Sequence, residues 1–167
     1  MTNEEIEMLD VEKDRMRFIK NKASANLALL GIVFDVFYFV NIYRSDAGSF
    51  YYTILIGASI VYNLLFLLGT FLASEGVKNY KKGYSYLLMV LGIGQIIRIF
   101  ILPRMAHAAT VTIGETSTIV MGNSQYTKVI AYLVLSAACL IVSGVISVKR
   151  CTTLENYLKT LENGKAA

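Results

Sequence analysis

Residues 25–43 read ANLALLGIVFDVFYFVNIY, and this stretch decides the fold. The run is long enough to cross a bilayer core of about 30 Å as a single helix. Asp35 lies near its middle, where a carboxylate costs roughly 2.5–3.5 kcal/mol on insertion scales. We therefore expect a transmembrane helix whose acidic group is shielded by a bundle interior, a partner, a water cavity or a bound proton.

Three more apolar runs follow the first one along the chain, and polar segments separate them. They predict further spans at residues 51–73, 84–102 and 126–148. The chain has 167 residues, 55% of them hydrophobic, which is unusually apolar for a water-soluble domain of this length. The sequence predicts an all-α membrane protein, a bundle of four transmembrane helices over residues 25–148.

Charge at the ends of the spans predicts how the bundle is oriented. Twelve of the 16 Lys and Arg residues lie in residues 1–24, 74–83 and 149–167, whereas the two opposite loops hold only Arg44 and Arg104. Because positive charge favours the cytoplasmic side, we expect a multi-pass cell-membrane protein with both termini in the cytoplasm. The basic groups cluster at the ends of the spans rather than on a soluble face, so we expect no binding to nucleic acid.

Both tails are predicted to be amphipathic cytoplasmic helices. The N-tail, residues 1–24, carries an apolar stripe and late basic residues, which suit either anionic membrane lipid or a protein partner. The C-tail, residues 149–167, contains Thr152 and Glu155 at the spacing of a capping box. We therefore expect a separate helix to begin there and to end at Gly164.

The long outer loop, residues 103–125, has a pattern of its own. Pro103 predicts that the third span stops at residue 102. Two short β-prone runs then flank Gly114 and Glu115, which predicts a short β-hairpin. Because a lone hairpin is marginally stable in water, it would need to pack on the bundle or on another protein.

One polar group per span falls near mid-membrane when depth is counted at about 1.5 Å per residue. This predicted buried layer consists of Asp35, Asn63, Gln95 and Ser136, with Arg98 about one turn further outward on the third span. Arg98 is expected either to pair with Asp35 or to extend its side chain to headgroups or a partner protein. Small residues beside these groups favour close packing of the helices around them.

The layer has two interpretations. It could fix the register of the helices, or it could bind a proton or a cation within the membrane. A single acid in the first of four short spans is similar to small multidrug exporters, but their tryptophan-containing motif is missing. The sequence has no nucleophile beside a base, no paired carboxylates, no phosphate loop and no metal-ligand spacing, so we expect no catalysis, cofactor or metal.

Two stretches carry a resemblance to known proteins: YYTILIGASIVYNLLFLLGTFLASEGVKNYKKGYS at 51–85 and SAACLIVSGVISVKRCTTLENYLKTLEN at 136–163. They resemble uncharacterised small four-span membrane proteins of gut-type Gram-positive bacteria of low GC content. Those proteins are often encoded beside carbohydrate ABC importers. The resemblance implies a non-catalytic accessory subunit that docks on importer permeases. The alternative is an independent proton- or cation-coupled transporter, working through Asp35 as an oligomer.

Overall fold

Four helices in the structure are long and apolar enough to cross a membrane. They are α2 (Lys22–Ile42), α3 (Phe50–Lys78), α4 (Lys82–Ile99), which the short α5 (Leu102–Ala108) continues, and α6 (Asn123–Lys165). The chain is a mostly helical bundle, as its four apolar runs predict. The structure is a computed structural model, and it describes residues 5–8, 10–11, 20–43, 50–113 and 116–165.

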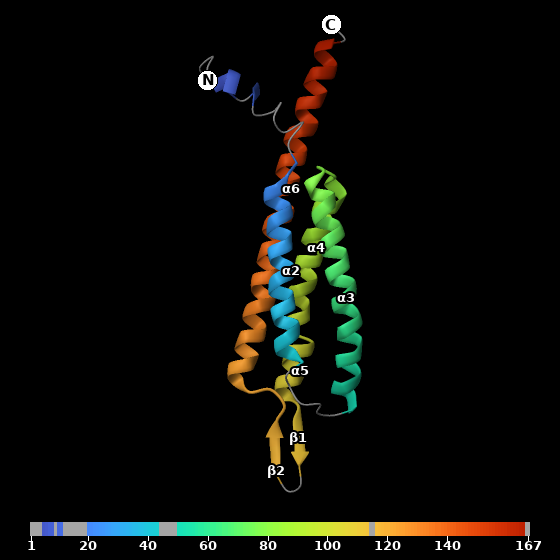
Figure 1. The fold of residues 1–167 in the computed structure, drawn as a ribbon, viewed down its shortest axis with the longest axis vertical. Helices are drawn as coiled ribbons and strands as arrows, with labels where there is room; N and C mark the ends of the chain where they lie inside the picture. Colours follow the sequence, from blue (N-terminus) through green and yellow to red (C-terminus); the bar gives the residue numbers. More distant parts are fainter. Residues whose placement is uncertain (1–4, 9, 12–19, 44–49, 114–115, 166–167) are drawn as a thin grey trace.

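The helices form a ring in which each packs on two neighbours. Helix α6 lies along α2 and α4, and α3 contacts the same two helices from the opposite side (Figure 1). Helix α2 begins and α6 leaves the bundle at one end, which we call the tail end, where Arg150 donates to Asn21 Oδ1 at 3.0 Å. The two strands lie at the other end, which we call the strand end.

Helix α6 is longer than the sequence predicts and extends well past the tail end of the bundle (Figure 1). It continues through the expected boundary at residues 148–149, so the helix start predicted at Thr152 is wrong. A capping box needs a break in the helix, but Thr153 instead bonds back to the Lys149 carbonyl within it. Glu155 pairs with Lys82 of α4 at 2.9 Å, which ties the extension to the bundle.

The third span also ends differently from the prediction. Helix α4 stops at Ile99, three residues before the expected end, and Pro103 lies in the first turn of α5. Proline suits this place because the first turn of a helix has no intrahelical partner for the missing N–H. Pro103 therefore starts a helix here instead of ending one.

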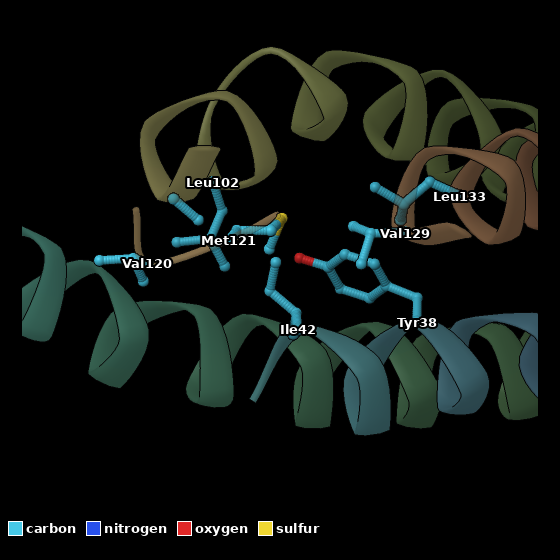
Figure 2. Close-up of a cluster of buried hydrophobic side chains, with 8 residues drawn as sticks. Tyr38, Ile42, Leu102, Val120, Met121, Val129 and Leu133 are labelled. Atoms are coloured by element: carbon cyan, nitrogen blue, oxygen red, sulfur yellow. The ribbon is translucent and has the colours of Figure 1, made fainter. Parts of the chain in front are cut away.

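Strands β1 (Thr110–Ile113) and β2 (Thr116–Ile119) pair antiparallel, with Thr110 opposite Ile119. The expected turn at 114–115 lies outside the described residues. Directly after β2, Val120 and Met121 enter an apolar cluster with residues of α2, α5 and α6 (Figure 2). Met121 is completely buried, so this cluster anchors the end of the strand pair to the bundle.

The packing is tight on one side of the ring and loose on the other. Ser136 and Ser143 of α6 donate to backbone carbonyls of α2 at 2.9 and 2.6 Å, and small residues let α6 approach α4 closely. By contrast, 17% of the residues in the most apolar stretch of α3 are buried, whereas the corresponding share is 33–39% in the other three spans. Helix α3 is thus the most weakly covered element of the bundle.

Candidate functional site

The candidate site is a charged cluster at the centre of the bundle. Asp35 of α2 is fully buried, and its Oδ1 accepts a hydrogen bond from Gln95 Nε2 of α4 at 2.7 Å. Arg98, one turn further along α4, lies 3.4 Å from the same oxygen through Nη1. Because α2 and α4 lie diagonally in the ring, these contacts cross the middle of the bundle.

The Arg98 guanidinium is enclosed on several sides. Its Nη2 donates to Ser59 Oγ of α3 at 2.9 Å, and only 7% of its side chain is exposed. The rings of Tyr38 and Tyr62 lie 4.3 and 4.9 Å from its central carbon, within the range of cation–π attraction. Arg98 therefore stays inside the bundle as the counter-ion of Asp35 instead of extending outward to headgroups.

The structure brings together some of the predicted layer and separates the rest. Asp35, Gln95 and Arg98 form one bonded group. Asn63 of α3 is fully buried, but neither atom of its amide has a hydrogen-bond partner within the described part of the chain. Ser136 is also buried, and it bonds to the Gly31 carbonyl of α2 instead of joining the charged group.

The sequence did not single out Ser59, Tyr38 and Tyr62 as partners of Arg98. The spacing of Tyr38 and Ser59 could have indicated that they are buried near the cluster. Tyr38 lies about one turn after Asp35, and Ser59 lies about one turn before Asn63. Residues so spaced share a helix face, so a buried Asp35 and Asn63 imply buried neighbours at those positions. Tyr62 had no such signal, because its ring reaches Arg98 from the edge of that face.

A groove of about 320 Å³ opens on the side of the bundle between α3 and α4. Its walls are mostly apolar, with Leu55 and Ala58 on the α3 side, and Ser59, Tyr62 and Arg98 supply its polar atoms. We call this feature the α3–α4 groove. It connects the charged cluster to the outer face of the bundle, at a depth where lipid would surround a protein inserted in a membrane.

Chemically, the site is an internally neutral ion pair with additional polar groups, rather than a reactive centre. Its members can hold helices in register, bind a small polar guest or present polar atoms to the α3–α4 groove. Among the residues that the structure describes, no three His, Cys, Asp or Glu side chains gather as metal ligands. Comparison of the chain with protein-family models, curated proteins and solved structures finds no match.

Proposed function

We propose that this protein is a non-catalytic integral membrane subunit that docks on a larger membrane complex through the α3–α4 groove. The observation that carries the proposal is the α3–α4 groove itself, a mostly apolar hollow of about 320 Å³ at membrane depth, whose wall includes the bonded Arg98 and Ser59. Lipid tails offer no hydrogen-bond partners, so polar groups facing them are costly. A transmembrane helix of a partner would fill the groove and keep lipid away from the buried cluster of Arg98 and Asp35.

The poor coverage of α3 supports a partner that packs on this helix. Its side chains Val61, Leu64 and Leu65 are 59–65% exposed, so much of the helix has no protein neighbour in the described chain. Helices associate in membranes through packing against small residues, and Ala58 and Gly94 leave the groove open for a knob from another helix. The groove therefore offers a hollow of mostly apolar surface to a partner helix.

The charged cluster favours a subunit over an independent transporter. Asp35 is fully buried and already paired with Arg98, so binding a cation would add an uncompensated charge at mid-membrane. A transporter would also need a path for its cargo, and four helices leave little room for one in a single copy. Transport through Asp35 as an oligomer remains the competing hypothesis, and the experiment below separates the two.

For the partner we propose the permeases of a bacterial carbohydrate ABC importer. This part rests on the resemblance of residues 51–85 and 136–163 to small membrane proteins encoded beside such importers. The proposed setting is the cell membrane, where membrane lipid surrounds the rest of the bundle.

Filling the α3–α4 groove should release the partner. Ala58 is exposed in the groove, so Ala58→Phe is expected to reduce co-purification of the partner at least several-fold while the bundle still folds. Ala131 is an exposed alanine on α6, on the opposite side of the ring, and Ala131→Phe is the matched control. Each variant would be purified in mild detergent from its native membrane at endogenous level, and its partners identified by mass spectrometry.

Recovery of importer permeases or their ATPase with wild-type protein and Ala131→Phe, but not with Ala58→Phe, is the expected pattern. Equal recovery with both variants would show that docking does not use the groove. If the wild-type protein purifies only as itself, and it moves protons or cations in liposomes in a way that Asp35→Asn abolishes, the transporter hypothesis replaces the subunit.

Orientation is a separate prediction. The tail end carries Lys22, Lys78, Lys82 and Arg150, so we propose that it faces the cytoplasm together with both termini. A reporter fused after Ala167 that is active only in the cytoplasm is expected to be active, and one that needs export is expected to be silent. The opposite pattern would reverse the orientation.

A further inference from the structure

The Tyr38 hydroxyl is one buried atom of the polar cluster that no described residue satisfies, and three further side chains have four more such atoms. These four atoms are Asp35 Oδ2, Gln95 Oε1, and both Oδ1 and Nδ2 of Asn63. All three residues are fully buried, and they come from α2, α4 and α3. Buried polar atoms without a partner are rare in native proteins, and each usually has a water or ion as its missing partner.

The bonds between helices place these three side chains at one depth. The Asn21 N–H donates to the Lys78 carbonyl at 2.9 Å, which fixes α2 against α3 at the tail end. Counted from that bond, Asp35 and Asn63 lie the same number of residues along their antiparallel helices, to within one residue. Gln95 bonds to Asp35 directly. These three fully buried side chains, at one depth and from three helices of a four-helix ring, therefore share the interior of the bundle.

The fourth side of the ring at this depth is apolar. The bond from Ser136 of α6 to the Gly31 carbonyl of α2 fixes the two helices against each other. Asp35 lies about one turn from Gly31 toward the strand end, so the level of Asp35 on α6 is about one turn from Ser136 in the same direction. There α6 places Leu133, which is fully buried. The buried residue that α6 contributes at this depth therefore offers the unsatisfied atoms no hydrogen-bonding group.

The chemistry of the unsatisfied atoms indicates which kind of small molecule or ion could bind among them. Of the four atoms on Asp35, Gln95 and Asn63, three are acceptor oxygens and only one is a donor, so the guest must donate hydrogen bonds or carry positive charge. Arg98 already balances the charge of Asp35 at 3.4 Å, so a bound cation would leave a net positive charge at mid-membrane. Water donates two hydrogen bonds, accepts others and carries no charge. A buried water commonly makes about three such bonds.

We propose that the centre of the bundle is a water-binding site, in which at least one buried water molecule bridges Asp35 of α2, Gln95 of α4 and Asn63 of α3. The site joins α3 to the rest of the cluster at this depth. In the described part of the chain, α3 also contacts the cluster through the bond from Arg98 to Ser59 and the Tyr62 ring beside Arg98. The helix that forms the groove is thus held partly through water.

Magnetisation transfer from water to side-chain amides tests the site in full-length ¹⁵N-labelled protein in nanodiscs. Transfer to the amide protons of Asn63 and Gln95 is expected in wild type. Asn63→Leu should abolish or strongly reduce the Gln95 signal because it removes one of the bridging partners. Ser136→Ala is the matched control, since Ser136 is buried nearby but bonds to the Gly31 carbonyl, and it should leave both signals in place.

Thermal melting in sodium, potassium and choline chloride at equal ionic strength supplies the second measurement. A water site predicts the same melting temperature in all three salts. A rise specific to one metal cation would overturn the proposal in favour of a cation site. Absence of water transfer to both amides in wild type would show a dry cluster and would also overturn it, even if Asn63→Leu failed to fold.

Discussion

Replacing Asp35 with leucine is expected to lower the free energy of unfolding by about 3–5 kcal/mol, which is the usual cost of removing one partner of a buried ion pair. The substitution leaves the Arg98 guanidinium with 7% of its side chain exposed and without its counter-ion. Arginine cannot shed its proton inside a protein, so the charge remains. Ser59 and the two tyrosine rings supply polar contacts but no negative charge.

Replacing the other partner, by Arg98→Met, is expected to lower the free energy of unfolding by less than Asp35→Leu does. It leaves Asp35 buried, but a carboxylate can neutralise itself by binding a proton. The double variant Asp35→Leu, Arg98→Met should be more stable than Asp35→Leu alone because it leaves no buried charge. Reversible unfolding of the four proteins in mixed detergent micelles measures the cycle. Additive losses would show that the two side chains do not act as a pair.

The pairing of Asp35 with Arg98 was one of two arrangements that the sequence predicted for Arg98, because helices have a fixed rise per residue. Counting from the ends of the apolar runs puts both groups, with Gln95 and Asn63, within reach of one another in depth. A charge in the membrane core must also find a partner, which restricts its options further. Depth and electrostatics together therefore limit the arrangement strongly, even in a single sequence.

Position around the ring could not be predicted in the same way. Exposed side chains such as Val36 and Phe37 are as apolar as buried ones such as Leu133, so the pattern of hydrophobicity alone does not show which face is buried. For this reason the sequence could not show that α2 and α4 lie diagonally, or that Tyr62 reaches Arg98. It also could not show that α3 is covered least.

The two wrong boundaries have a local cause. Thr152 and Glu155 match a capping motif, and Pro103 matches a stop signal, but each signal also fits another context. In α6 the contact between Glu155 and Lys82 and the bond of Thr153 within the helix favour continuation. Motifs of three or four residues do not specify such contacts with distant elements.

Close approach of α4 and α6 leads to the last prediction. A methyl group added at Gly144 of α6 would lie 2.5 Å from Met89 Cγ and 2.8 Å from the Ser85 carbonyl oxygen of α4. The methionine can move, but the carbonyl belongs to the α4 backbone, so the two helices would have to separate. Gly144→Ala is therefore expected to lower the free energy of unfolding by about 1–3 kcal/mol, the usual cost of overpacking.

Gly57 of α3 provides the matched control, since nothing lies within 4 Å of a methyl group placed there. Alanine favours a helix over glycine by about 1 kcal/mol, so Gly57→Ala should be neutral or slightly stabilising in the same unfolding measurement. Because Ser85 also donates to Ser147 Oγ at 2.7 Å, separating α4 from α6 would weaken that bond as well. Equal stability of the two variants would mean that α4 and α6 are farther apart than the structure places them, whereas a selective loss in Gly144→Ala would identify this seam as the tightly packed side of the bundle, opposite the loosely covered α3.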